Sequence, residues 1–468
     1  MYREQIDAYI DAHKEQLIDD VMKLVRIDSQ RTQEVPGKPY GEGPAEVLEA
    51  AKELMDSYGF ATRNYENRVV TGDFNDKEKQ LDILAHLDVV PVTKDWTVTE
   101  PFQPVIKDGK IYGRGTADDK GPAMAALYAM KAIKDLGIEL DYNVRLILGS
   151  DEECGSSDLV YYYGIEKEAP MSFTPDADYP VINIEKGHFS KKFHGEFEDC
   201  DALPKIVKIQ GGGKVNVVPA NAEAVILGLE EQKALDAARN AEDETKVKFT
   251  VTKNQDEIVI TAKGVAGHAS TPEVGNSALT ALLQLLAGLE TAPSQGFEKI
   301  RALAKLFPHN DYYGKGMGIE MEDEISGKLT MNLGVFQYTP TSISGQFDSR
   351  VPICGTEENV TRVGRAKMEE AGLVMEEGPM TPPHHVPGDS VFVQTLLGSY
   401  EAYTGIKGEP LAIGGGTYVH GLERGVAFGC MIPDVDNHMH GDDEFMDIDM
   451  LIMSTKIFAD AIVILCKK

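Results

Sequence analysis

The chain has 468 residues, of which 42% are hydrophobic and 26% are charged. A chain of this length usually has more than one hydrophobic core, and the composition is that of a soluble globular protein, so we expect two or three domains. The formal net charge of −30 argues against nucleic acid or an anionic membrane as a partner, because the acidic surface would repel phosphate groups. A pocket for an anionic substrate would need its own local cations.

Residues 1–27 place apolar side chains among charged ones at roughly helical spacing. This pattern predicts an amphipathic surface helix and lacks the continuous apolar core of a signal peptide. No later segment approaches the ~20 apolar residues of a membrane span. The five cysteines are scattered and odd in number, which disfavours a disulfide framework or a cysteine-based zinc knuckle. We therefore predict a cytoplasmic protein with no membrane partner.

The chain alternates helices and strands up to about residue 180. Residues 44–58 and 121–137 are rich in helix formers. Residues 81–85 and 144–150 are short apolar runs, typical of strands in a sheet that is covered on both faces. This order predicts an α/β domain with a mostly parallel sheet and helices on both faces. In such a sheet, ligands bind beyond the carboxyl ends of the strands.

The pattern changes after residue 184. Alternating strands within 247–264 and an apolar helix at 276–290 indicate an α+β domain. An α/β pattern returns from residue 388 to the C-terminus, with helices expected at 389–404 and 447–466. We therefore expect a discontinuous α/β domain, residues 1–184 and 383–468, into which an α+β domain, residues 185–382, is inserted.

The strand at 81–85 ends in two polar residues, His86 and Asp88, within the stretch LDILAHLDVVP. Side chains two positions apart in a strand lie on the same side, so these two are close enough to interact. The pair is either the polar end of a strand or a metal ligand whose ring is oriented by a carboxylate.

Other carboxylates follow the predicted elements in the same way. Asp151, Glu152 and Glu153 come directly after the strand at 144–150, and packing them together is unfavourable unless a cation offsets their repulsion or a proton is retained. A solvated loop is the alternative for these three. Asp118 could simply cap a helix, and Asp176, between two prolines, could lie in a plain turn.

Near the C-terminus, the stretch NHMHGDDE contains two histidines, His438 and His440, beside a run of acids. Two histidines and three carboxylates could hold two divalent ions with one carboxylate shared, and a bridging hydroxide would balance the charge. Such a site needs one more carboxylate as a general base, and the adjacent Glu152 and Glu153 would supply one residue of each kind. Because the chain has 76 acidic residues, composition does not select the ligands.

The motifs together carry a specific resemblance. In chain order they are H-x-D-V-V-P, G-R-G-x-x-D-D-K-G-P, D-E-E, P-D-A-D-Y-P, G-H-A-S and H-x-x-D-E. Their order and spacing resemble the M20 family of metallopeptidases along essentially the whole chain. The pattern is most similar to the bacterial PepV-type dipeptidases, which are also described as Xaa-His or carnosinase-like dipeptidases.

This resemblance implies a ligand set of five residues. His86, Asp118 and Asp176 would hold one ion, and Asp118 would bridge to a second ion that is also bound by Glu153 and His440. His440 is preferred over His438 because it fits the spacing of the H-x-x-D-E motif. The resemblance also implies a cis peptide bond after Asp118.

The same resemblance assigns catalytic roles to three further residues. Glu152 would be the general base, Asp88 would orient His86, and His268 would stabilise the oxyanion. On sequence alone, a histidine such as His268 is more often structural.

Four residues are implied in substrate binding. Arg350 would bind the terminal carboxylate of the peptide, for which its planar fork is suited, with help from Asn216. The backbone amides of Gly414 and Gly415 would complete these contacts. The chain has TYVHG at residues 417–421 where PepV-type members usually have T-Y-G-R, and this difference affects either the pocket rim or substrate preference.

The function implied is hydrolysis of unblocked dipeptides by a water that bridges two metal ions, in a monomer whose inserted domain is a lid. Zinc is the first expectation for the metal, with Mn²⁺ or Co²⁺ as alternatives, since histidine and carboxylate ligands suit all three. The alternatives are an N-acyl amino acid amidohydrolase, of the acetylornithine deacetylase or succinyl-diaminopimelate desuccinylase type, and a non-catalytic relative that binds metal or peptide. All five ligands and Glu152 are present in the chain, which disfavours the last of these.

Overall fold

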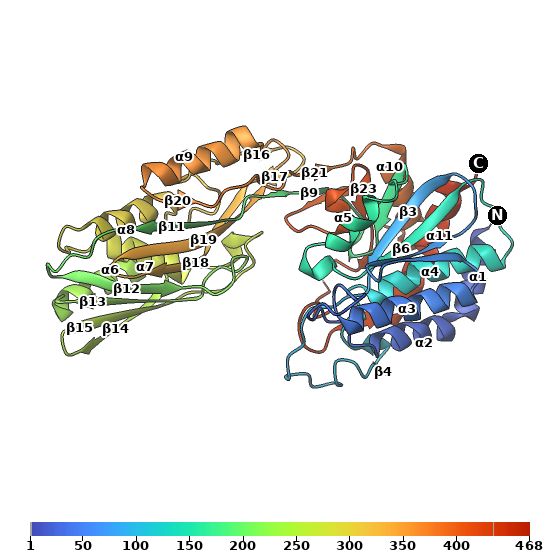
Figure 1. Cartoon of the computed structure of the whole chain (residues 1–468), viewed down its shortest axis with the longest axis horizontal. Helices are drawn as coiled ribbons and strands as arrows, with labels where there is room; N and C mark the ends of the chain where they lie inside the picture. The colour runs from blue at the N-terminus through green and yellow to red at the C-terminus, as the bar shows by residue number, and fades with distance from the viewer. Residues whose placement is uncertain (1, 434) are drawn as a thin grey trace. The chain divides into compact units, whose positions relative to one another are not determined.

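The computed structural model describes residues 2–433 and 435–468. The chain divides into two compact units, which are coloured by residue number in Figure 1. The first unit is formed by Met1–Glu185 and His384–Lys468, and the second by Lys186–Pro383. Each unit is described by itself.

The first unit contains a nine-stranded mixed sheet. In order across the sheet, its strands are β1 (Ala61–Tyr65), β2 (Val69–Asp73), β6 (Asn143–Gly149), β3 (Lys79–His86), β7 (Met171–Thr174), β23 (Gly425–Ala427), β9 (Val181–Glu185) and β21 (His384–His385), with β22 (Pro410–Ile413) also paired to β9. The central strands β6, β3, β7 and β23 are parallel, and β1, β2 and β21 pair in antiparallel fashion toward the two edges. The carboxyl ends of the central strands therefore meet at one edge of the sheet.

Helices cover both faces of this sheet. They are α1 (Arg3–Ala12), α2 (Lys14–Val25), α3 (Glu42–Ser57), α4 (Lys120–Asp135), α5 (Ser157–Tyr163), α10 (Val391–Thr404) and α11 (Ile448–Cys466). Ile83 and Ala85 of β3 belong to the core that contains α4 and α11, whereas the intervening Leu84 belongs to a second cluster with residues of α5. This alternation is what a strand buried on both faces requires. The predicted α/β class is confirmed.

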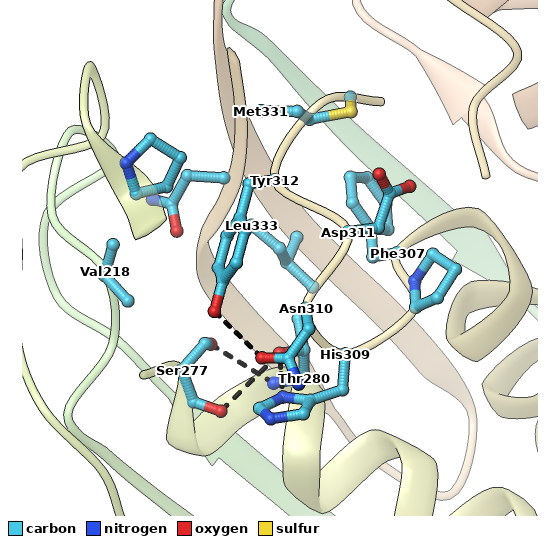
Figure 2. A pocket seen from close by; sticks show the side chains of 13 residues that line it. Val218, Ser277, Thr280, Phe307, His309, Asn310, Asp311, Tyr312, Met331 and Leu333 are labelled. Atoms are coloured by element: carbon cyan, nitrogen blue, oxygen red, sulfur yellow. Dashed lines mark hydrogen bonds between the residues drawn. The ribbon is translucent and has the colours of Figure 1, made fainter. Parts of the chain in front are cut away.

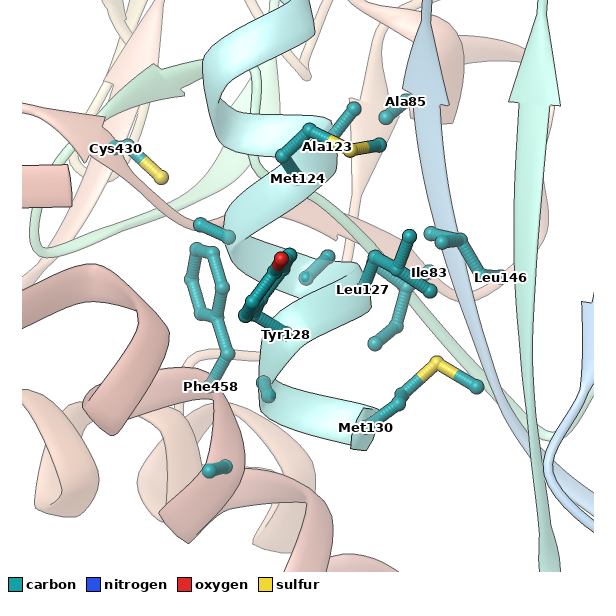
Figure 3. Packing of buried hydrophobic residues seen from close by; sticks show 14 of the residues in the cluster. Ile83, Ala85, Ala123, Met124, Leu127, Tyr128, Met130, Leu146, Cys430 and Phe458 are labelled. Atoms are coloured by element: carbon teal, nitrogen blue, oxygen red, sulfur yellow. The ribbon is translucent and has the colours of Figure 1, made fainter. Parts of the chain in front are cut away.

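Helix α4 lies at the centre of the larger core (Figure 3). Its residues Met124 and Leu127 are fully buried, as are Ile83 of β3 and Phe458 of α11. Figure 3 shows α4 between the strands of the sheet and the C-terminal helix, which explains why nearly every residue of α4 is buried.

The predicted N-terminal helix is interrupted at His13, which separates α1 from α2. The ring of His13 stacks on Tyr9 at a centroid distance of 3.9 Å, and its Nδ1 lies 2.8 Å from the Tyr9 carbonyl oxygen. The break lets each shorter helix bury its own apolar side chains, such as Ile10 in α1 and Val21 in α2.

The second unit has a nine-stranded sheet in which the pairings among the described strands are all antiparallel. In order they are β14 (Lys248–Asn254), β15 (Glu257–Lys263), β13 (Asn221–Leu227), β12 (Lys205–Gly211), β18 (Thr330–Tyr338), β19 (Ser342–Val351), β11 (Lys191–Glu196) and β20 (Val374–Met375), with β10 (Gly187–His188) also paired to β19. Its helices are α6 (Glu231–Thr245), α7 (Ala278–Ala287), α8 (Gln295–Leu306) and α9 (Arg362–Glu370). This unit has its own apolar core.

Short strands complete both units. They are β4 (Val105–Lys107), β5 (Lys110–Tyr112) and β25 (Phe445–Asp447) in one small sheet, β8 (Ala177–Asp178) with β24 (Cys430–Met431), and β16 (Glu322–Asp323) with β17 (Gly327–Lys328). Within the described residues, no helix is both long enough and apolar enough to cross a membrane.

A small cavity lies in the second unit beside His309 (Figure 2). Nδ1 of His309 is 3.0 Å from the hydroxyl oxygen of Thr280, and the Tyr312 hydroxyl donates a hydrogen bond to Asn310 across the same space. The cavity measures about 20 Å³, which is room for one water molecule. It is too small for a peptide substrate.

Candidate metal centre

Four of the five predicted metal ligands lie at the carboxyl edge of the parallel strands. His86 is the last residue of β3, and Asp176 lies two positions after the end of β7. Glu153 belongs to the short 3-10 helix η1 (Glu152–Cys154), which begins after β6, and Asp118 lies just before α4. Because parallel strands end at a common edge, residues far apart in sequence are brought together there.

The side chains form two groups that share Asp118. Nε2 of His86 is 2.9 Å from Oδ1 of Asp118 and 3.6 Å from Oδ2 of Asp176. Nε2 of His440 is 2.8 Å from the other carboxylate oxygen of Asp118 and 3.3 Å from Oε1 of Glu153. In each group of three, one potential ligand atom per residue lies within 4.8 Å of the others. The peptide bond between Asp118 and Asp119 is cis.

Burial of so many carboxylates raises their affinity for protons. Burial, together with the nearby Asp118, raises the pKa of Asp176 to about 6 and also raises the pKa of Glu153. Hydrogen bonds to Asp118 and Glu153 raise the pKa of His440 to about 10. The anionic cluster thus favours any bound positive charge, whether that charge is a proton or a metal ion.

The donor set fits a pair of divalent cations. It offers two imidazole nitrogens and three carboxylates, which are ligands for Zn²⁺, Mn²⁺ and Co²⁺. Oε1 of Glu153 is buried and has no hydrogen-bond partner of good geometry among the described residues, although His440 Nε2 is 3.3 Å away. A cation between these atoms would satisfy that oxygen.

Asp88 contacts both His86 and the two glutamates. Its carboxylate accepts hydrogen bonds from the backbone N–H groups of Glu152 and Glu153, each at 3.2 Å. Nδ1 of His86 is 3.0 Å from the backbone carbonyl oxygen of Asp88 and 3.5 Å from its carboxylate. The carbonyl is therefore the nearer partner of the ring, and the carboxylate mainly holds the turn that carries the glutamates.

Glu152 lies in the same anionic surroundings. Burial, reinforced by Asp176 and Glu153, raises the pKa of Glu152 well above its usual value, although His86 acts in the opposite direction. A carboxylate with a raised pKa is the kind of group that can take up a proton in catalysis.

His440, and not His438, reaches the cluster. Nδ1 of His438 lies 3.0 Å from the carbonyl oxygen of Asp442, so that ring contacts its own loop. The sequence motif favoured the same histidine, and the geometry adds the contacts of His440 with Asp118 and Glu153.

The other predicted catalytic residue, His268, and two predicted substrate-binding residues lie in the second unit. His268 and Asn216 are exposed on neighbouring loops, which are joined by a hydrogen bond from the Ala269 N–H to the Asn216 carbonyl. Partial burial and the nearby Arg350 guanidinium lower the pKa of His268, which favours its neutral form.

Arg350 lies in β19 and is nearly buried. Its Nε donates to Asp348 at 2.8 Å, and its Nη1 is 2.9 Å from Nε2 of His188. His188 pairs with Arg350 across the antiparallel strands β10 and β19. The sequence carries no motif around His188, so this contact emerges only from the strand pairing.

The glycine segment in the first unit begins with Gly414 and Gly415, directly after β22. The residues that follow are anchored internally: Thr417 donates a hydrogen bond through its hydroxyl to Glu185 at 2.7 Å. The ring of Tyr418 packs edge-on against His86 at a centroid distance of 6.1 Å. The sequence assigned no role to Tyr418 itself, and its signals are the TYVHG stretch at 417–421 and the three glycines before it.

A family model matches residues 83–463, described as peptidase family M20/M25/M40. The chain is 36% identical over 459 residues to a "Putative dipeptidase YtjP" of Bacillus subtilis, covering 97% of this chain and 98% of the relative. It is 34% identical over 465 residues to a "Beta-Ala-Xaa dipeptidase" of Lactobacillus delbrueckii subsp. lactis, covering 98% and 97%.

Two solved structures share the fold. Human carnosine dipeptidase 1 matches with a TM-score of 0.59 and 16% identity, over 100% of this chain and 99% of that one. Aminoacylhistidine dipeptidase from Vibrio alginolyticus matches with a TM-score of 0.60 and 17% identity, over 97% of both chains. With the family model and the full-length relatives, the conclusion is that this chain is a peptidase that belongs to family M20/M25/M40.

Proposed function

We propose that the protein is a metal-dependent dipeptidase that hydrolyses unblocked dipeptides. The observation that supports this most is the pair of ligand groups sharing Asp118, with Glu152 next to one of the ligands. The name of the Lactobacillus relative, which matches along nearly its whole length, also supports a dipeptide substrate.

The metal would be held by the five residues of the two groups. These residues would hold two divalent ions, with Zn²⁺ expected first and Mn²⁺ or Co²⁺ as alternatives, and the bound metal would supply Lewis-acid activation of the scissile carbonyl and of the attacking water. Glu152 would accept the proton of that water and later deliver it to the leaving amine. Asp88 would keep Glu152 and Glu153 in place through their backbone N–H groups.

Substrate recognition is assigned mainly to the second unit, which we propose to be the lid domain, while the first unit is the catalytic domain. Arg350, supported by Asp348 and His188, would bind the terminal carboxylate of the dipeptide together with Asn216. His268 in its neutral form would donate a hydrogen bond to the oxyanion. The amides of Gly414 and Gly415 in the first unit would bind the remaining oxygens of the substrate.

A substrate panel tests this function. Initial rates would be measured on metal-stripped protein reloaded with Zn²⁺ or Mn²⁺. The panel holds a free dipeptide, its N-acetylated form, a tripeptide, carnosine, N-acetylornithine and N-succinyl-diaminopimelate. We expect hydrolysis of the free dipeptides only. Hydrolysis of the acylated compounds instead would identify an amidohydrolase, and no hydrolysis with either metal would indicate a binding protein.

The cytoplasmic location and the monomeric state remain predictions from the sequence. Size-exclusion chromatography with light scattering would measure the second directly.

A further inference from the structure

His440 differs from the other four ligands in its surroundings. Its side chain is 52% exposed, whereas the side chains of the other four are at most 11% exposed, and it belongs to a loop near the C-terminus. His438, His440 and Asp443 in this loop all have positive φ angles, of 60°, 62° and 57°. Non-glycine residues adopt this backbone conformation rarely, so neighbouring structure has to hold the loop in place.

The residue that ends this loop, Glu444, is completely buried. Its Oε1 accepts hydrogen bonds from the backbone N–H of Ala117 at 2.9 Å and of Asp118 at 3.3 Å. Its Oε2 accepts a hydrogen bond from Nη1 of Arg114. The carboxylate of Glu444 therefore holds the backbone of the ligand that both groups share.

Arg114 connects the same carboxylate to the His440 loop. The side chain is only 2% exposed, and its Nη2 donates to the carbonyl oxygen of Gly441 at 2.8 Å. The guanidinium also lies over the ring of Trp96, at 5.5 Å from its centroid. One planar group thus reaches Glu444 and Gly441 at the same time, a geometry that the single ammonium of a lysine does not reproduce.

Neither Arg114 nor Glu444 belongs to the ligand groups. A buried ion pair contributes little net stability compared with apolar residues of similar size, so its value here is geometric. The chain of contacts runs from Asp118 through Glu444 and Arg114 to Gly441, the neighbour of His440.

We propose that Arg114 and Glu444 are positioning residues that set the separation of Asp118 and His440. They thereby control binding at the group formed by Asp118, Glu153 and His440, and leave the group formed by His86, Asp118 and Asp176 largely unaffected. This inference rests on the proposed metal-dependent function.

The test is metal binding by the full-length, metal-stripped protein, measured by titration calorimetry with Mn²⁺ and by metal content after dialysis. The variant Arg114→Lys retains a positive charge opposite Glu444 but loses the fork to Gly441. We expect two ions per wild-type chain, and in the variant one ion held as in wild type and a second held about 10- to 100-fold more weakly. Glu444→Gln should show the same pattern, because the glutamine oxygen can still accept from the Ala117 and Asp118 N–H groups while its NH₂ group no longer pairs with Arg114.

Arg145 offers a matched control. It is 1% exposed, forms a two-pronged pair with Asp82 at 2.8 and 2.7 Å, and donates to the carbonyl of Lys167, but it contacts none of the proposed ligands. Arg145→Lys should lower the unfolding temperature of the metal-free protein and leave both metal affinities at the wild-type values.

Four outcomes would count against these proposals, and they differ. The positioning role would be overturned if both ions bound equally more weakly in Arg114→Lys and Glu444→Gln. It would also be overturned if both ions bound these variants with wild-type affinity. Metal affinities in Arg145→Lys that change as much as in Arg114→Lys would do the same, since any buried arginine would then have the effect. A wild-type chain that binds one ion or none would instead overturn the two-ion centre of the proposed function.

Discussion

The two units each contain a nine-stranded sheet, yet only the first gathers a cluster of potential metal ligands among the described residues. In the first unit, β3, β6 and β7 run parallel, so His86, Glu153 and Asp176 follow strands that end at one edge. In the second unit neighbouring strands run in opposite directions, and their carboxyl ends are divided between two edges. Strand direction therefore decides which unit can assemble a multi-residue centre from short loops.

The second unit uses antiparallel pairing differently. Its charged groups are arranged along and across strands: Asp348 and Arg350 are two positions apart in β19, and His188 is opposite Arg350 in β10. Such an arrangement holds one side chain rigidly, which suits the binding of a substrate group rather than of a metal ion. The predictions that follow test the proposed division between chemistry in the first unit and recognition in the second.

The largest effect is expected from Glu152→Ala in the first unit. Removal of the proposed general base should lower kcat by about 10²- to 10⁴-fold, because proton transfer then lacks a positioned acceptor. Metal content should stay at two ions per chain, since Glu152 is not in either ligand group. The exposed Glu139→Ala is the control and should keep wild-type rates. A Glu152→Ala variant with wild-type kcat would refute the base assignment.

The independence of the units is tested by core truncations. Leu127 in α4 and Leu282 in α7 are both fully buried and belong to different cores. Each change to alanine should cost about 2–5 kcal/mol in the free energy of unfolding of its own unit. Calorimetry should show Leu282→Ala lowering one transition while Mn²⁺ affinity is unchanged. If Leu282→Ala weakened Mn²⁺ binding as strongly as Leu127→Ala, the metal centre would depend on both units.

Arg350→Ala tests recognition in the second unit. Loss of a charge-assisted contact to the substrate carboxylate should lower kcat/KM by roughly 10- to 150-fold, equivalent to about 1.5–3 kcal/mol. The comparison substrate is the same dipeptide with an amidated C-terminus, for which the wild type should already be slow and the variant should be no slower. An equal loss on both substrates would mean that Arg350 acts only through folding.

The smallest effect concerns the pH dependence of stability in the second unit. Asp323 is partly buried, which raises its pKa, but hydrogen bonds from the Ser326 hydroxyl and from the backbone N–H groups of Ser326, Cys354 and Ile325 outweigh this and lower the pKa to about 2. Because the folded pKa lies below the ordinary value of about 3.8, the stabilisation is complete above pH 4 and is lost as the pH falls toward 2.

Asp323→Asn should therefore be less stable than wild type by about 1 kcal/mol at pH 7, and the difference should shrink by pH 3. Urea unfolding at both pH values measures it. A difference that grows on acidification would show that the carboxylate does not stabilise the folded state.

The sequence by itself determined several central elements of the first unit, some of the second, and the identities of the candidate ligands. Apolar runs such as 81–85 and 144–150 became β3 and β6, and the helical pattern at 121–137 became α4, because burial on both faces demands a local pattern that is visible in the chain. The ordered motifs indicated the family and selected His86 and His440 from the other histidines. Each of these signals lies within a short segment of the chain, so it can be identified from the sequence.

Only the tertiary structure decided how these pieces are joined. It showed that the Asp88 carboxylate holds the backbone of Glu152, and that Arg114 is tied to Glu444 across 330 positions of the chain. It also interrupted the N-terminal helix at His13 and placed antiparallel strands at the edges of a sheet that was expected to be mostly parallel. Such contacts depend on which distant segments become neighbours in the fold, and a local pattern of polar and apolar residues does not predict this.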